Sequence, residues 1–303
     1  ISNRYIGTPF QARNTPPYST TEPNFIPTRF TFLLHRSLIF LACYLITDIL
    51  LLLNQPALNP IVYDEIHVPF VRRLLKSEVT MEETSIRVST TIGFWIGAYI
   101  CIQGYCTTMS ILAVASGFMS PVDRRPTFGS PMDAYSIRRF WGRFWHQLMR
   151  KKFGTVADFL TFPLLRVLHL PDKPHTLFPR YTQLTLVFLI SGLLHQAIEV
   201  AQGLLWSQSG ALKFFLLMAI GIMIEDAAVS IWGALLTQGS KSVNGARGSE
   251  AEVVWWRKGF GYIWVILYLS WATPVWAYPG LRRDTGQIEF NPLPFSFIGL
   301  LRT

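Results

Sequence analysis

The sequence has few charged residues and few cysteines for its length. Only 15% of its 303 residues are charged, whereas a water-soluble domain usually has about 25%. Its three cysteines, Cys43, Cys101 and Cys106, lie inside apolar stretches and lack the spacing of a disulfide framework or a zinc site. We therefore expect no metal, and we interpret the three thiols as small buried apolar groups.

Several common catalytic and binding motifs are also missing. There is no GxSxG elbow, HExxH pair, P-loop or dinucleotide-binding fingerprint. No nucleic-acid-binding module is visible, so the net charge of +9 does not indicate a nucleic-acid partner. Instead, Lys and Arg stand between apolar runs, where they would face anionic lipid head groups. We expect membrane lipid as a partner and no obligate protein partner.

Apolar residues are abundant and make up half of the sequence. They form runs long enough to cross a hydrocarbon layer of about 30 Å as helices, and no internal repeat relates these runs. The runs are Phe30–Leu53, Ile86–Phe118, Tyr181–Trp206, Ala211–Leu236 and Phe260–Tyr278. The sequence therefore predicts an all-α, multi-pass integral membrane protein, with one transmembrane domain over residues 30–303.

The segments between these runs are shorter and more polar. Residues 1–29 are rich in Pro, Asn, Thr and Arg, and we expect them to extend over the protein surface. Tyr63–Lys76 and Ile137–Phe153 are predicted to be amphipathic helices at the membrane interface. Val156–Leu170 contains a proline and an arginine, which favours a broken or re-entrant helix. Because the chain begins at Ile rather than Met, we expect further residues and further spans before it.

The second apolar run contains two glycines, Gly93 and Gly97. Residues four apart lie on one face of a helix. Small residues at this spacing let the backbone of a neighbouring helix approach closely. We therefore predict close helix packing at this pair.

Polar residues form a stripe within the third apolar run. Ionisable groups at the centre of a span cost about 2.5–3.5 kcal/mol on insertion scales, so they need a partner or a function. Ser191, His195, Glu199 and Gln202 follow one another at steps that place them on one helix face. A neutral His195 can serve as a general base, with Glu199 fixing its tautomer. The alternatives are an interhelical hydrogen bond without catalytic duty or the proton relay of a transporter.

The segment Ile137–Arg150 combines aromatic and basic residues. Its apolar residues recur at the period of a helix, which predicts one continuous amphipathic helix. The opposite face would carry Arg139, Arg143, His146 and Arg150. One interpretation is an interfacial helix with tryptophans at the lipid boundary and arginines on phosphates. The other is that the polar face lines a chamber, where His146 meets a substrate carbonyl and the arginines bind coenzyme A phosphates.

Two adjacent carboxylates, Glu225 and Asp226, stand in the middle of the fourth apolar run. Adjacent side chains do not face the same direction on a helix. We expect at least one of them to pair with another helix or to stay protonated. A structural hydrogen bond, a proton-donating acid and a contact to a substrate hydroxyl are the three alternatives.

Two of these segments resemble a known family. Phe140-Trp141-Gly142-Arg143-Phe144-Trp145-His146-Gln147 resembles the FWGRRWHQ signature of the wax-synthase-like branch of the membrane-bound O-acyltransferases. Residues 188–195 resemble the FxxSGxxH segment of that branch, and residues 4–14 resemble a stretch of its fungal members. The sequence departs from the signature at Phe144, where a second Arg is common, so this position carries no charge for anion binding.

The resemblance implies an acyl-CoA:alcohol O-acyltransferase with more spans than the five counted above. The family's membrane histidine corresponds to His195, and its companion position, often Asn in other branches, corresponds to His146. Fungal relatives often acetylate terpenoid alcohols, whereas plant relatives make wax esters from long-chain alcohols. The implied reactants are acetyl-CoA or another acyl-CoA and a hydrophobic alcohol, with no permanently bound cofactor. We expect the protein in the endoplasmic reticulum.

We assign His195 as the general base and His146 as a hydrogen-bond donor to the developing oxyanion. The residues that we expect to contact the alcohol or the acyl donor are Arg139, Arg143, Trp145, Gln147, Arg150, Ser191, Glu199 and Glu225. Two other functions stay open. A membrane terpene cyclase would use Glu225 or Asp226 as its acid, and a secondary transporter would use a relay of His and Glu.

Overall fold

Five long helices dominate the computed structural model, which describes residues 4–53, 60–174, 176–239, 255–284, 293 and 296–300. All regular elements in these ranges are helical. The long helices are α1 Arg29–Leu53, α3 Met81–Ala115, α6 Leu177–Ala201, α7 Ala211–Gly239 and α8 Trp255–Asp284. Each contains a stretch long and apolar enough to cross a membrane. The predicted all-α class and the five predicted spans are therefore confirmed.

Shorter elements connect the spans and close the chain. The α-helical ones are α2 Phe70–Leu75, α4 Ile137–Arg139, α5 Arg150–Val167 and α9 Phe297–Leu300. The tighter or wider turns are η1 Pro60–Tyr63, η2 Glu65–His67, η3 Pro121–Arg124, η4 Pro131–Asp133 and the π-helical η5 Phe140–Phe144.

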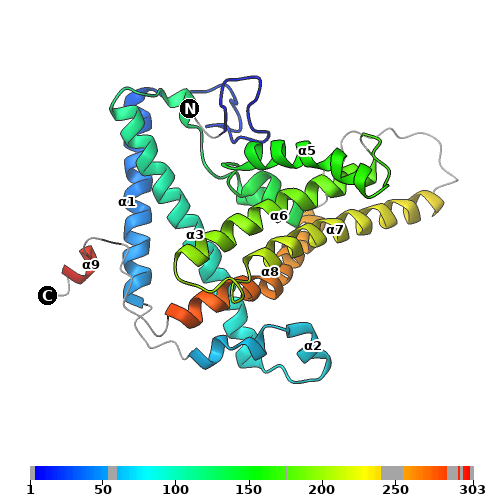
Figure 1. Ribbon diagram of the computed structural model, residues 1–303. Coiled ribbons are helices and arrows are strands. Elements are labelled where there is room, and N and C mark those ends of the chain that lie inside the picture. Colours follow the sequence, from blue (N-terminus) through cyan, green and yellow to red (C-terminus); the bar gives the residue numbers. More distant parts are fainter. Residues whose placement is uncertain are drawn as a thin grey trace.

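The helices pack as two groups that α8 joins. Helix α1 packs against α3, and α6 packs against both α5 and α7. Helix α8 contacts α3 in one group and α7 in the other. In Figure 1 the N-terminal segment lies beside α5 at one end of the molecule, while α2 lies at the opposite end. The π-turn η5 and α4 lie against α7, in the group that carries α6.

Helix α3 places polar residues inward and apolar residues outward. Its buried side chains include Arg87, Thr91, Gln103, Thr107 and Ser110, whereas Ile92, Ile96 and Leu112 are exposed. This is the reverse of a helix on a water-soluble protein, and it suits a lipid-facing surface, because lipid offers no hydrogen bonds.

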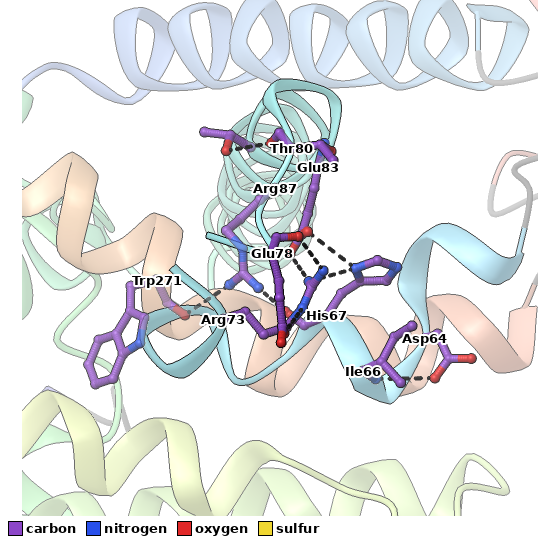
Figure 2. Close-up of polar contacts among 10 residues, drawn as sticks. Asp64, Ile66, His67, Arg73, Glu78, Thr80, Glu83, Arg87 and Trp271 are labelled. Atoms are coloured by element: carbon purple, nitrogen blue, oxygen red, sulfur yellow. Dashed lines mark hydrogen bonds and ion pairs between the residues drawn. The ribbon is translucent and has the colours of Figure 1, made fainter. Parts of the chain in front are cut away.

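A cluster of charged residues ties four elements, η2, α2, α3 and α8, together at the end of the molecule that carries α2 (Figure 2). Arg73 on α2 forms an ion pair with Glu83 on α3, and its guanidinium also lies 2.9 Å from Nδ1 of His67. Arg87 donates to the carbonyl of His67 and, at 3.3 Å, to the carbonyl of Trp271 on α8. The cluster therefore fixes α8 against α3.

Residues 4–28 contain no helix, and they are anchored by side chains that reach inward. Arg4, which is 5% exposed, donates to the carbonyls of Arg125 and Pro126. The Tyr18 hydroxyl contacts the carbonyls of Pro121 and Arg124 at 2.5 and 2.9 Å. The segment thus holds the connection between α3 and α4, which carries no regular structure of its own beyond two short turns.

Two predictions about the shorter elements are wrong. Tyr63–Lys76 is not one amphipathic helix, because it is divided among the end of η1, η2 and α2. Val156–Leu170 is not broken, because α5 continues from Arg150 through Pro163 to Val167. Pro163 removes only the hydrogen bond to the carbonyl four residues earlier, and the neighbouring turns keep the helix continuous.

The predicted glycine seam on α3 is also wrong. A Cβ atom built on Gly93 or Gly97 meets nothing within 4 Å. Close approach occurs instead at Gly192 on α6, where a Cβ would lie 2.9 Å from Cα of Leu212 on α7. Cys101 departs from the expectation too, since it is exposed, and the other two thiols are half-buried.

Candidate active site

The segment that carries His146 is not the continuous helix that its periodicity predicts. Helix α4 has three residues, η5 has five, and the backbone becomes extended at Trp145, with φ −64° and ψ 151°. The Gln147 side chain donates to the carbonyls of Trp141 and Trp145 at 3.0 and 2.5 Å. The backbone of Gly129 packs against the same turn, with its N–H 2.8 Å from the carbonyl of Phe144. These contacts outweigh the local helical preference.

The predicted shared polar face is therefore wrong. Arg139 pairs with Asp133 at 2.5 Å, and Arg143, whose side chain is 52% exposed, lies 3.9 Å from the same carboxylate. Arg150 begins α5 and donates to the carbonyl of Gly142 and to Gln147, both at 2.8 Å. Only His146 of this set turns toward the aromatic core.

His146 lies among aromatic rings, with an unsatisfied ring nitrogen. Its ring centroid is 5.5 Å from that of Trp145 and 5.9 Å from that of Phe128. Burial, then the neighbouring His195 and then Arg4 lower the pKa of His146 to about 4. Its Nδ1 is buried and has no hydrogen-bond partner among the described residues. The imidazole is therefore neutral near pH 7, and its buried Nδ1 is available for a hydrogen bond.

His195 lies on α6 and contacts two rings from neighbouring spans. It stacks on Phe215 of α7 with centroids 4.8 Å apart and planes 12° apart. It also contacts Trp276 of α8 at 5.0 Å, with an angle of 65° between the rings. Gly192, three residues earlier, lets α7 approach closely enough for the stacked contact, because a Cβ there would lie 3.2 Å from Cβ of Phe215. Ser191 is half-buried on the same side of α6.

A chain of ring contacts joins the two histidines. Trp141 lies 5.6 Å from Phe215, which stacks on His195, and 6.0 Å from Trp145, which contacts His146. The indole Nε1 of Trp141 is buried and, like Nδ1 of His146, has no hydrogen-bond partner among the described residues. Two polar ring nitrogens therefore lie available in one aromatic environment, where a substrate oxygen can satisfy them.

Glu199 was predicted to fix the tautomer of His195 through a hydrogen bond, but its carboxylate has other partners. Its carboxylate accepts hydrogen bonds from Trp276 at 2.7 Å and from Ser209 at 2.5 Å. The side chain therefore orients Trp276, which in turn contacts the imidazole. Gln202, the last residue of the predicted stripe, is exposed just after α6. The inward part of the stripe thus consists of Ser191, His195 and Glu199.

Glu225 and Asp226 both hold neighbouring elements in place. Glu225 accepts from the backbone N–H groups of Ile137 and Arg138 at the start of α4 and from Nε1 of Trp264. Asp226 pairs with Arg138 at 2.5 Å, pairs with Arg180 at 2.8 Å and accepts from the hydroxyl of Tyr181. Pairing with other elements is as predicted, and these contacts support the structural alternative for both carboxylates.

Aromatic residues on the spans are the part of the site that sequence reasoning missed. Trp95 on α3, Phe214 and Phe215 on α7 and Trp276 on α8 all belong to, or pack against, the core that contains Trp145. Nothing in the sequence marks these rings, because aromatic residues inside an apolar span are ordinarily packing residues. Trp145 and Gln147, which were predicted to contact substrate, are both buried within this core.

Comparison with known proteins gives a consistent match. Residues 124–217 match the Membrane bound O-acyl transferase family, a stretch that contains both histidines. The acetyltransferase fsoF of Humicola fuscoatra is 32% identical over 94% of this chain, and the acetyltransferase atnC of an Arthrinium species is 33% identical over 98%. The chain spans 67% and 64% of the lengths of these two relatives. The acetyltransferase ataH of Aspergillus terreus is 33% identical, with 96% of this chain and 90% of that protein covered.

Proposed function

The chain belongs to the membrane bound O-acyl transferase family, and on this premise we propose that it transfers an acetyl group from acetyl-CoA to the hydroxyl of a hydrophobic alcohol. The observation that carries the proposal is that His146, which follows η5, and His195 on α6 are linked by a series of contacting aromatic rings in the core. The low pKa of His146 supports it further, because a neutral imidazole is the form that donates or accepts a hydrogen bond without carrying charge.

In the proposed reaction His195 removes the proton from the alcohol as its oxygen attacks the thioester carbonyl. The carbon–sulfur bond then breaks, and the departing CoA thiolate takes the proton that His195 holds, so that ester and CoA thiol leave. General-base help of this kind contributes about 10²–10⁴-fold. A thioester is already activated, so no covalent enzyme intermediate is needed.

The developing oxyanion needs hydrogen-bond donors, and two are proposed. His146 donates from its ring, and the indole N–H of Trp141 is a second donor of the same region. Their buried ring nitrogens without partners support this assignment. One preorganised donor in a dry site contributes about 3 kcal/mol to transition-state stabilisation.

Acetyl is the proposed acyl group for two reasons. The relatives named above are acetyltransferases. In addition, Phe215 and Trp276 both lie within 5.0 Å of the His195 ring, centroid to centroid, and leave little room for a longer chain on that side. A terpenoid is the proposed alcohol, with a long-chain alcohol as the second candidate, and the proposed location is the endoplasmic reticulum. The contacts of Glu225 and Asp226 do not favour a terpene cyclase.

The test compares His195→Ala with His35→Ala, which removes an exposed histidine from α1. Each purified protein is incubated with labelled acetyl-CoA and a panel of hydrophobic alcohols, and ester formation is measured. We expect His35→Ala to behave as the wild type and His195→Ala to lose turnover by at least about 10²-fold, at an unchanged melting temperature. Full activity of His195→Ala would remove the assignment, and alcohol-independent loss of thioester would contradict the proposed reaction.

A further inference from the structure

A cavity of about 410 Å³ lies between the N-terminal segment and the first turns of α5. Tyr5 and Phe10 line it from the N-terminal side. Lys151, Lys152, Thr155 and Val156 line it from α5. One wall is therefore aromatic, and the other carries two ammonium groups.

The N-terminal wall is held in a defined shape. The buried Arg4 anchors it to the carbonyls of Arg125 and Pro126, and the N–H of Ala12 donates to the carbonyl of Arg4 at 2.8 Å, which closes a loop around Phe10. Tyr5 has a φ of +51°, a left-handed conformation that a bulky residue rarely adopts. Such conformations persist where the surrounding contacts fix them, and they are frequent at ligand-binding positions.

Positive charge around the cavity is not neutralised by the described part of the chain. Of the six basic residues between Asp133 and Asp158, the first three lie within 4 Å of a carboxylate of Asp133 or Asp226, and Arg150, Lys151 and Lys152 do not. Burial and, after it, the neighbouring Arg13 lower the pKa of Arg150, the first residue of α5. Among the described residues, no carboxylate forms an ion pair with Arg13, Arg150, Lys151 or Lys152. The Lys151 ammonium lies over the ring of Phe10, 5.8 Å from its centroid. A bound polyanion would relieve this repulsion.

The cavity adjoins the segment that carries His146. Lys151 follows His146 by only five positions, and Gln147 and Arg150 are hydrogen-bonded to each other between them. Tyr5 follows Arg4, whose charge contributes to the low pKa of His146. The α5 wall of the cavity is therefore continuous in the chain with the segment that holds the imidazole.

We propose that this cavity binds the adenosine 3′,5′-bisphosphate end of the acyl donor. The adenine lies against Tyr5 and Phe10, and the 3′-phosphate is bound by Lys151 and Lys152. Aromatic rings are suitable for stacking with a base, and ammonium groups are suitable for a phosphate dianion. The inference rests on the proposed acetyl transfer, and it makes the N-terminal segment part of the donor site.

The experiment uses the full chain with two donors, acetyl-CoA and 3′-dephospho-acetyl-CoA. We expect the wild type to show a KM about tenfold lower for acetyl-CoA, because a hydrogen bond to a charged group is strong enough for that discrimination. Lys151→Gln together with Lys152→Gln should remove the discrimination by raising KM for acetyl-CoA alone, with kcat unchanged. The matched control is Lys173→Gln, an exposed lysine beyond the end of α5, which should keep the discrimination.

A second readout separates this inference from the proposed function. Binding of free adenosine 3′,5′-bisphosphate is measured by calorimetry on the wild type, on the Lys151/Lys152 double variant and on Phe10→Ala. We expect binding to be about tenfold weaker in both variants. Binding that is lost in the variants, in a protein that transfers no acetyl group, would keep the cavity assignment and reject the reaction. Acetyl transfer with unchanged discrimination and unchanged binding in the double variant would overturn the cavity assignment alone.

Discussion

Gly192→Ala adds one methyl group at the point where α6 and α7 approach each other most closely beside His195. The new Cβ would lie 2.9 Å from Cα of Leu212, 3.1 Å from its Cδ1 and 3.2 Å from Cβ of Phe215. The Cα of Leu212 and the Cβ of Phe215 are fixed by the backbone of α7, so neither can rotate away. The helices must therefore separate, and the stacked contact between His195 and Phe215 must change.

The size of the effect follows from these distances. Ordinary contact begins at 3.4 Å, so the backbone of α7 must move by about 0.5 Å relative to α6. Overpacking of this kind costs about 1–3 kcal/mol, partly offset by about 1 kcal/mol from the better helix propensity of Ala. A misplacement of about 1 Å in a catalytic site costs about 10²-fold in rate, so a movement of half that size corresponds to roughly tenfold in kcat.

The assay measures kcat for acetyl transfer and the melting temperature in one detergent. Gly97→Ala is the matched control, because it gains the same helix propensity while its Cβ meets nothing within 4 Å. We expect Gly97→Ala to be as active as the wild type and slightly more stable. Gly192→Ala should be about tenfold slower and less stable than the control. If the two variants were equally active and equally stable, the close approach at Gly192 would not position His195, and this reasoning would be refuted.

Three further predictions concern the rings, the imidazole and the charged cluster. Phe215→Ala should raise the ratio of kcat/KM for butyryl-CoA to kcat/KM for acetyl-CoA by about tenfold or more, because each added methylene that a pocket accepts is worth about 10-fold or more. Phe159→Ala, on the exposed face of α5, is the control and should leave this ratio as in the wild type. An unchanged ratio in Phe215→Ala would exclude Phe215 as a limit on chain length. Burial lowers the pKa of His146 to about 4, below its unfolded value of about 6.5. The contribution of the ring to stability is therefore complete above about pH 6.5 and falls as the pH drops toward about 4. His146→Asn should flatten the dependence of the melting temperature on pH in that range, and an unaltered slope would show that burial does not lower the pKa of the ring. Arg73→Met removes the arginine that pairs with the buried carboxylate of Glu83, and it should lower the free energy of unfolding by about 3–5 kcal/mol. Glu78→Gln is the control, because Glu78 is a half-exposed partner of Arg73, and it should change the free energy of unfolding by less than about 1 kcal/mol.

The spans could be predicted from the sequence because lipid imposes a simple condition on each of them. A run such as Ala211–Leu236 is apolar over most of its length, and only a helix satisfies its backbone in hydrocarbon. The inward direction of His195 could be predicted for the same reason, since a polar stripe avoids lipid. Both conclusions depend on single segments and on no contact between them.

The turn at His146 could not be predicted, because it depends on contacts between segments. The periodicity of residues 137–149 fits a helix throughout, but Glu225 binds the two N–H groups that begin α4, and the backbone of Gly129 packs against the carbonyl of Arg143. Glu199 was assigned to His195 because it lies one turn further along the helix. Its actual partners, Ser209 and Trp276, come from outside α6. Tertiary partners decide such polar side chains, and spacing within one helix does not reveal them.

Helix α7 carries both Phe215, against His195, and Glu225, at the start of the segment that leads to His146. Between these positions the helix rises by about 15 Å as one continuous rod. One helix therefore holds both segments that carry a proposed catalytic imidazole, at two positions along its length. One residue inserted between Phe215 and Glu225 would therefore turn these two contacts by about 100° against each other and misalign the two segments.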